Sequence, residues 1–194
     1  MTIVYIHGAS ATGESFTHIR EHINKPDIVI DYDSSKGFSN NLRDMKEQLE
    51  TEEKLFFVGH SLGGIYALHL ADAYYAKTLG GITLSTPYGG SREADYARYF
   101  LPFSRLMRDI GPNCEPMARV KDLKVPKIWS NVVTMKGQSP WILEPNDGVV
   151  TIESQRANKK MELLEVDLNH YEVVISNKTL ELIHLQLNKT VLGQ

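Results

Sequence analysis

Short apolar runs alternate with amphipathic stretches along most of this 194-residue chain. The apolar runs have the length of buried strands, and we predict strands at 2–6, 27–31, 54–58, 80–85, 126–132 and 161–166. Between them, apolar positions recur at helical spacing, which predicts helices at 14–23, 39–50, 61–77, 151–157 and 177–189. Leu42, Met45 and Leu49, for example, give the second helix an apolar face. This alternation indicates an α/β fold with about six mainly parallel strands flanked by helices.

One long stretch, from Thr86 to Val125, does not fit the alternation. It carries no obvious strand, and Pro102 must break or kink any helix in it. An excursion of this length with so much apolar content is more typical of a functional segment than of disorder. We therefore predict a small cap at about 87–124 whose side chains line a substrate pocket, namely Tyr88, Phe100, Phe103 and Met107. Two alternatives remain open: the aromatic side chains pack on the core, or they form a docking surface for another protein.

Composition narrows the class of protein. The length suits one domain covering 1–194, and a formal net charge of −3 without a basic stripe argues against nucleic acid as a partner. The chain passes from Met1 into an apolar strand without a basic region or a long apolar segment, which predicts a cytoplasmic protein with no stable membrane insertion. Cys114 is the single cysteine, and no Cys/His set has metal-ligand spacing, so we expect neither a disulfide framework nor a metal.

The strongest chemical signal is the segment 59–64, Gly-His-Ser-Leu-Gly-Gly, between the strand at 54–58 and a helical pattern. A serine flanked by glycines at a strand-to-helix turn is typical of a nucleophile elbow, in which the strained turn exposes the hydroxyl of Ser61. The five-residue pattern alone is weak, since an ordinary glycine-rich turn also matches it. The preceding apolar strand and the following helix strengthen the interpretation.

A serine hydroxyl needs a base to take its proton and a third group to orient that base. Ligands of parallel α/β folds lie at the carboxyl ends of strands, so the useful histidine should follow a strand. His170 follows the strand at 161–166 and is the predicted base. His60 lies next to Ser61 but should point elsewhere. Others fall within predicted helices, where surface or half-buried histidines are common: His18, His22, His69 and His184.

The predicted acid is Asp147, in a turn-rich loop after the strand at 126–132. Its position between Ser61 and His170 gives the order serine, aspartate, histidine. Glu144 and Asp167 are the competing carboxylates, and Asp147 could also simply stabilise its own Asp-Gly turn.

Acyl-transfer chemistry also needs two backbone N–H groups that hold the oxyanion. One should come from Leu62, the residue after Ser61. The other should come from the loop after the first strand, His7-Gly8-Ala9-Ser10, where Ala9 is the predicted donor and His7 braces the loop.

Four motifs in this order resemble an α/β-hydrolase of the lipase/esterase kind: His7-Gly8, the elbow at 59–63, the segment 146–150, and Asn169-His170. The segment 85–91 also resembles, in part, the loop after the sixth strand of bacterial triacylglycerol lipases. Starting directly at the strand before the oxyanion loop is similar to minimal lipases. Some such lipases hold calcium near the catalytic histidine; Glu172 is present here but a second ligand is not evident, so calcium is not expected.

The residues and the resemblance together predict a serine hydrolase that cleaves a small-molecule acyl ester through an acyl-enzyme, without a cofactor. A thioesterase, an amidase or an acyltransferase would use the same groups, and the fold does not separate them. A protein that binds an acyl ligand without turnover is the remaining alternative.

Overall fold

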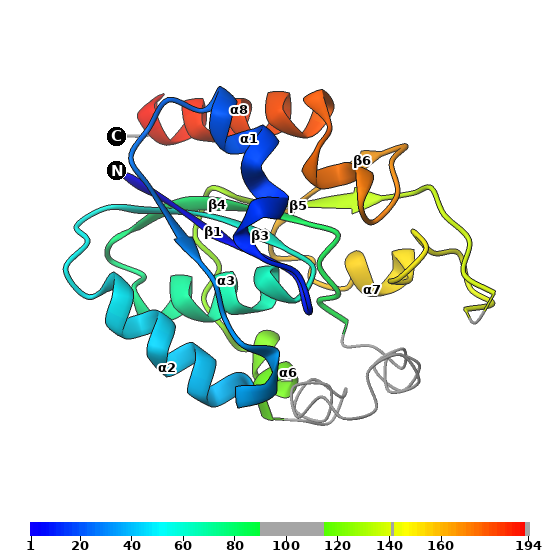
Figure 1. Cartoon of the computed structure of the whole chain (residues 1–194), viewed down its shortest axis with the longest axis horizontal. Coiled ribbons are helices and arrows are strands. Elements are labelled where there is room, and N and C mark those ends of the chain that lie inside the picture. Colours follow the sequence, from blue (N-terminus) through cyan, green and yellow to red (C-terminus); the bar gives the residue numbers. More distant parts are fainter. Residues whose placement is uncertain (90–114, 141, 193–194) are drawn as a thin grey trace.

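The fold is built on a single six-stranded parallel sheet (Figure 1). The computed structural model describes residues 1–89, 115–140 and 142–192. The strands occur in the order β2-β1-β3-β4-β5-β6, and each neighbouring pair runs parallel. Their bounds are β1 (Thr2–Ile6), β2 (Asp27–Ile30), β3 (Leu55–His60), β4 (Thr78–Leu84), β5 (Trp129–Thr134) and β6 (Glu162–Val166). The predicted α/β class with six mainly parallel strands is confirmed.

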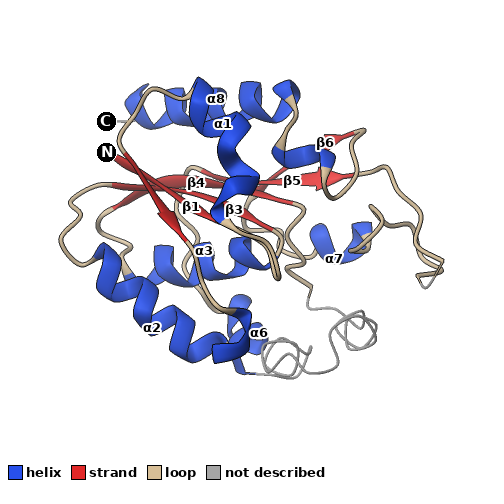
Figure 2. Cartoon of the chain, in the orientation of Figure 1, coloured by secondary structure: helices blue, strands red, loops and turns tan. Residues whose placement is uncertain are grey.

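Helices cover both faces of this sheet (Figure 2). The segment predicted as one helix at 14–23 is a 3₁₀ turn, Gly13–Phe16, followed by α1 (Thr17–His22), and it lies on the same face as α8 (Asn177–Leu192). The opposite face carries α2 (Phe38–Leu49), α3 (Leu62–Ala73) and α6 (Glu115–Val120). A one-turn helix, α7 (Ile152–Gln155), and two further 3₁₀ turns, Ser34–Lys36 and Glu172–Val174, complete the described elements.

Several predicted boundaries differ from the structure by a few residues, and two of the larger differences have identifiable reasons. The helix after Ser61 ends at Ala73 and not at residue 77, because the backbone N–H groups of Lys77 and Thr78 both bond to the carbonyl of Tyr74 and form a turn into β4. Strand β5 begins at Trp129 and not at residue 126. Pro126 has no N–H to donate to a ladder, and pairing with β4 starts three residues later.

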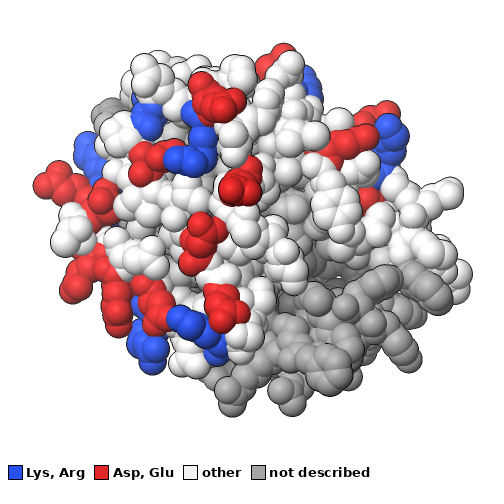
Figure 3. Space-filling view, viewed as in Figure 1, with Lys and Arg blue, Asp and Glu red and all other residues white. Residues whose placement is uncertain are grey.

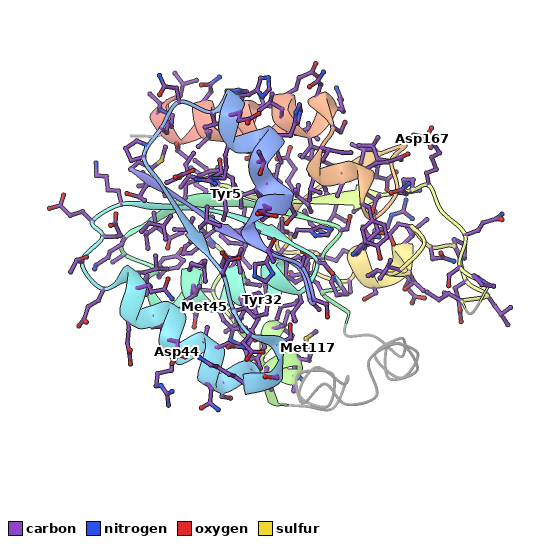
Figure 4. All side chains as sticks on the ribbon, in the orientation of Figure 1. Tyr5, Tyr32, Asp44, Met45, Met117 and Asp167 are labelled. Atoms are coloured by element: carbon purple, nitrogen blue, oxygen red, sulfur yellow. The ribbon has the colours of Figure 1, made fainter. Side chains whose placement is uncertain are left out.

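Each face of the sheet packs its own hydrophobic cluster, as expected of a parallel sheet covered on both sides. Every residue of β3 is buried. Figure 4 shows Met45 and Met117 on the face covered by α2, α3 and α6, while Tyr5 lies on the other face, where its ring contacts Phe16. Buried positions on α2 recur three or four residues apart and explain its orientation: Phe38, Asn41, Met45 and Leu49.

The described ends of the long stretch from Thr86 to Val125 pack into the core. Helix α6, which the sequence pattern does not predict, contributes Met117 and Val120 to the cluster that also holds Tyr88. Residues 90–114 lie outside the described part of the chain, so the cap at 87–124 and the pocket residues Phe100, Phe103 and Met107 stay predictions.

Acidic and basic side chains are interspersed on the face seen in Figure 3. Within the described ranges, none of the helices has both the length and the apolar character needed to cross a membrane.

Candidate active site

The turn at Ser61 joins β3 to α3 in a conformation that few residues with a side chain adopt. Ser61 has φ 53° and ψ −122°, so its backbone lies in the strained positive-φ region. Its N–H donates to the carbonyl of Leu84 at 2.8 Å, and its carbonyl accepts from Gly64 at 3.0 Å. The turn is therefore held by the neighbouring strand and by the first turn of α3.

Glycine is required where α3 approaches the sheet. A Cβ on Gly63 would overlap the carbonyl oxygen of Ile6, at the end of β1, and a Cβ on Gly64 would overlap the hydroxyl of Thr86. The missing side chains let the helix start directly against the ends of two strands. This close approach brings the N-terminus of α3 to the loop that follows β1.

That loop, residues 7–10, lies against the elbow. A Cβ built on Gly8 would come within 3.2 Å of Cβ of Ser61 and 3.1 Å of Nδ1 of His60. His7 is buried, its ring stacks on Tyr32 with centroids 4.3 Å apart, and its Nε2 accepts the N–H of Tyr32 at 3.2 Å. Because Nε2 is an acceptor, Nδ1 carries the proton and donates to the carbonyl of Gly8 at 2.7 Å.

The bond from His7 orients the peptide that contains the N–H of Ala9. In a trans peptide the carbonyl and the following N–H point in opposite directions. Since the carbonyl of Gly8 turns toward His7, the N–H of Ala9 turns away from it. The N–H of Leu62 is in the first turn of α3 and has no acceptor within the helix. The two predicted donors thus belong to segments that meet at the elbow, the loop after β1 and the start of α3.

His170 and Asp147 form a buried pair after β6 and β5. Nδ1 of His170 is 2.8 Å from Oδ2 of Asp147, and their side chains are 4% and 0% exposed. The backbone N–H of His170 also donates to the carbonyl of Asp147 at 3.1 Å. Burial alone would raise the pKa of Asp147, but hydrogen bonds from His170, Thr134 and the N–H of Val150 together hold the pKa below its ordinary value. The carboxylate is thus ionised near neutral pH, with Nδ1 of His170 as a donor to it.

His60 links this pair to the elbow. Its Nε2 lies 2.9 Å from the carbonyl oxygen of His170, and the two rings have centroids 4.8 Å apart. His60 directly precedes Ser61, so the elbow and the His170 loop are in contact. Burial, reinforced by the nearby His170, lowers the pKa of His60 to about 3. His60 is therefore a neutral structural contact directed at the backbone of His170.

Comparison with solved structures supports this arrangement as a known fold. The chain is similar to an alpha/beta superfamily hydrolase from Oenococcus oeni, with TM-score 0.70 and 15% identity over 98% of this chain and 92% of the other. It is also similar to the mature lipase BlEst2 of Bacillus licheniformis, with TM-score 0.67 and 17% identity over 95% and 91%. A lipase-esterase related protein from Clostridium acetobutylicum matches with TM-score 0.63 and 15% identity over 95% and 93%. The chain has the α/β-hydrolase fold.

No family model matches the sequence, and the curated proteins contain no match. The α/β-hydrolase assignment therefore rests on the architecture, in agreement with the sequence motifs. At these identities the comparisons establish the fold of this chain and leave its reaction to be argued from the site.

The competing carboxylates lie in different surroundings from Asp147. Glu144 and Asp167 are both exposed, and Figure 4 shows Asp167 at the outer edge of the molecule, in the loop after β6. Glu172, the residue considered for calcium, accepts the N–H of Asn169 at 3.0 Å and so stabilises the turn that carries His170. Within the described ranges, no three His, Cys, Asp or Glu side chains are grouped in a way that could hold a metal ion.

The remaining predicted residues occupy structural positions or lie outside the described part. Tyr88 is 5% exposed; its hydroxyl donates to Thr83 at 3.0 Å and accepts from Nε1 of Trp129 at 3.3 Å. This position matches the alternative in which the aromatic side chain packs on the core. His69 bonds to the carbonyl of Pro116 at 3.0 Å, and His18 bonds to Asn177 at 3.1 Å.

Sequence reasoning missed two residues that contact Asp147. Thr134, at the end of β5, donates to Oδ2 at 2.6 Å, and Gln155, in α7, donates to the same atom at 3.1 Å. A threonine at a strand end and a glutamine in a helical pattern have no distinguishing signature. The only available signal was the position of Thr134 at the carboxyl end of a strand, where site residues of this fold gather.

Proposed function

We propose that this chain is a serine-dependent acyl hydrolase that cleaves carboxylic esters through an acyl-enzyme. The main support is the buried 2.8 Å hydrogen bond between His170 and Asp147. His60, which directly precedes Ser61, bonds to the backbone of His170 and so connects this pair to the strained elbow. An ionised, desolvated carboxylate that holds one imidazole nitrogen leaves the other nitrogen free to act as a base. Such an arrangement suits activation of a hydroxyl nucleophile.

In the proposed acylation step, Oγ of Ser61 attacks the ester carbonyl while Nε2 of His170 takes the hydroxyl proton. Asp147 keeps the proton on Nδ1 and stabilises the imidazolium that forms. The N–H groups of Leu62 and Ala9 stabilise the negative charge on the carbonyl oxygen. The tetrahedral adduct then expels the alcohol, which receives its proton from Nε2 of His170.

In the second step, His170 takes a proton from water, and the resulting hydroxide attacks the acyl-serine. The adduct collapses to a carboxylic acid as its bond to Oγ of Ser61 breaks, and Nε2 of His170 returns its proton to Oγ. Apart from water and the substrate, every group required by these two steps belongs to the chain itself, so the proposal needs no cofactor.

The names of similar structures agree with ester chemistry without fixing it. They include the lipase and the lipase-esterase related protein described above, and Est816, an N-acyl homoserine lactone degrading enzyme, at 17% identity and TM-score 0.67. The same fold is also used by tomato methylketone synthase I, at 14% identity and TM-score 0.64. A small-molecule acyl substrate is therefore proposed, with the acyl group and the alcohol left open.

A fluorophosphonate probe tests the nucleophile directly. We expect it to label the wild type and to fail on Ser61→Ala, while Ser15→Ala, which alters a half-buried serine on another turn, labels normally. Labelling of Ser61→Ala at the wild-type rate would refute the assignment.

The bond that is cleaved is tested with a matched panel of acyl esters, a thioester and an anilide that share one acyl group. Ester turnover above the other two supports the proposal. Preference for the thioester or anilide would reassign the enzyme to a thioesterase or amidase, and acyl transfer to an added alcohol in place of water would identify an acyltransferase. Tight acyl-ligand binding with no turnover of any substrate would indicate a non-catalytic binding protein.

A further inference from the structure

The carboxylate of Asp147 is surrounded entirely by hydrogen-bond donors. Oδ1 accepts the backbone N–H groups of Val149 at 3.0 Å and Val150 at 2.8 Å. Oδ2 accepts from His170 at 2.8 Å, Thr134 at 2.6 Å and Gln155 at 3.1 Å. The side chain is fully buried, so these donors replace water as the solvation shell of the charge.

Proton counting fixes the direction of the bonds from Thr134. An ionised carboxylate only accepts hydrogen bonds, so the single hydroxyl proton of Thr134 lies on the 2.6 Å contact to Oδ2 and not on the longer 3.2 Å contact to Oε1 of Gln155. Oγ of Ser85 is 2.8 Å from Oγ1 of Thr134 and must therefore be the donor in that contact. Ser85 is fully buried and holds a strained φ of 51°, which gives this short chain of hydroxyls a defined geometry.

The orientation of Gln155 is fixed in the same way. Its Oε1 accepts the backbone N–H of Thr134 at 2.9 Å, so its Nε2 faces Oδ2 of Asp147. The backbone carbonyl of Gln155 is in turn held by the side-chain amide of Asn131 at 2.8 Å. Thr134 in β5 and Gln155 in α7 thus both donate to Asp147, which lies in the segment between these two elements.

These donors act on the charge in two opposing ways. They keep Asp147 ionised and correctly oriented despite complete burial. Thr134 and Gln155 also compete with His170 for the lone pairs of Oδ2. Each of these donors polarises Oδ2 and leaves less negative charge there to stabilise the imidazolium of His170.

We infer that Thr134 and Gln155 are positioning residues that set how strongly Asp147 stabilises the protonated form of His170, and hence the pH at which the base becomes available. This role rests on the proposed function of the Asp147–His170 pair. Besides Asp147, the titratable rings against His170 in the described residues are those of His60 and Tyr171, with centroids 4.8 Å and 5.5 Å from the imidazole, and the substitutions below leave both in place. Thr134 has the shorter contact and should dominate. Neither residue touches the substrate in the proposed mechanism.

Thr134→Val tests the inference because it removes the donor with little change in shape. We expect the acid limb of the kcat/KM profile to move to higher pH by about 0.5 unit, because the charge-assisted bond to Oδ2 is lost and part of that interaction passes to His170. Thr134→Ser keeps the hydroxyl and should restore the wild-type profile. Thr179→Val is the matched control, since it removes a buried threonine hydroxyl in α8 that makes no hydrogen bond to any described residue.

The ring of His170 is also titrated by nitrogen-detected NMR in the resting protein, which reads the same coupling without turnover. A higher midpoint in Thr134→Val, restored in Thr134→Ser, supports the inference even if no ester is cleaved, so failure of the proposed function is separately visible. An unchanged or lower midpoint in Thr134→Val overturns it. In Thr134→Val the hydroxyl of Ser85 loses its acceptor, which could prevent folding. In that case the double variant Ser85→Ala/Thr134→Val removes both hydroxyls and must show the same upward shift of the His170 midpoint.

Discussion

The side chain of His60 donates a hydrogen bond from Nε2 to the backbone carbonyl of His170, 2.9 Å away. The donor nitrogen must carry the proton because a carbonyl only accepts, so Nδ1 of His60 is unprotonated and, within the described residues, has no partner. The residue before the proposed nucleophile thereby fixes the backbone of the proposed base. The contact spans 110 residues of sequence and joins the last residue of β3 to the loop after β6.

This contact predicts a pH dependence of stability. Burial lowers the pKa of His60 to about 3, below its unfolded value of 6.5. The unfolded chain therefore binds a proton that the folded chain does not, and the free energy of unfolding falls as pH drops from about 6.5 toward 3. The fall attributable to one such group is about 1.4 kcal/mol per pH unit within that window.

His60→Gln keeps an N–H donor but cannot titrate. We expect urea denaturation of this variant to show a weaker loss of stability between pH 7 and 4 than the wild type. His22→Gln, which alters an exposed histidine on α1, serves as the control and should follow the wild-type curve. Equal pH dependence in His60→Gln and wild type would contradict the assignment of His60 as buried and neutral.

Two buried threonines of α8 predict opposite effects of the same substitution. Among the described residues the hydroxyl of Thr179 has no hydrogen-bond partner, whereas the hydroxyl of Thr190 donates to the carbonyl of Leu187 at 2.6 Å. Thr179→Val should raise the free energy of unfolding by about 1 kcal/mol, because it removes an unpaired buried polar group, while Thr190→Val should lower it by about 1 kcal/mol. Chemical denaturation of both variants checks the sign, and stabilisation by both or by neither would contradict this account.

We expect Asp147→Asn to lower both the stability of the protein and its activity, for separate reasons. An amide presents one accepting oxygen and one donating nitrogen, yet donors face both oxygens of Asp147. One side of the amide must oppose donors, which we expect to lower the free energy of unfolding by about 2 kcal/mol. His170 also loses the charge that selects its tautomer, so kcat should fall by about 10⁴.

Ester hydrolysis and fluorophosphonate labelling should slow together in Asp147→Asn, since both require activation of Ser61. Asp167→Asn changes an exposed carboxylate three residues before His170 and should leave both rates near wild type. Loss of activity in Asp167→Asn with retention in Asp147→Asn would reverse the choice between the two acids.

The strands and helices that position the site could be predicted because each has a local pattern of apolar residues. Leu55 to Val58 is an uninterrupted apolar run, and it is buried on both faces of the sheet. Asp147 and His170 could be placed after neighbouring strands because the carboxyl ends of parallel strands share one edge. The sequence predicted Asp147 as the carboxylate that orients His170 but left Glu144 and Asp167 as competitors, and the 2.8 Å contact between Asp147 and His170 could be seen only in the structure.

The residues that sequence reasoning missed act through contacts between distant segments. Gln155 reads as one polar position in a helical stretch, and only the packing of α7 against β5 directs its amide to Asp147. Helix α6 was missed because it has only six residues and includes Pro116, too little for a helical period to emerge. Its role depends on Met117 and Val120 reaching a core formed by α2 and α3.

The bond from His7 to the carbonyl of Gly8 predicts a graded series of oxyanion-loop variants. The side-chain nitrogen of asparagine can occupy the position of Nδ1, so His7→Asn can still donate to Gly8 at the observed 2.7 Å geometry, whereas His7→Leu cannot. Loss of this donor leaves the Gly8 carbonyl held by the longer 3.3 Å bond from the N–H of Ala11, so we expect the Gly8–Ala9 peptide to shift and the N–H of Ala9 to be misdirected. Because one oxyanion donor contributes about 10²–10³ in kcat, His7→Leu should lose at least tenfold more kcat than His7→Asn, with a smaller change in KM.

Fluorophosphonate labelling separates this effect from general unfolding, because Ser61 should still react in both variants at a reduced rate. Tyr32→Phe provides the matched control for the loop, since it keeps the ring that stacks on His7 and removes only the hydroxyl bond to the His7 carbonyl. That bond is made to the peptide between His7 and Gly8 and not to the Gly8–Ala9 peptide, so we expect Tyr32→Phe to change kcat less than His7→Leu. Equal losses in His7→Asn and His7→Leu would show that the imidazole acts through packing and not through its hydrogen bond.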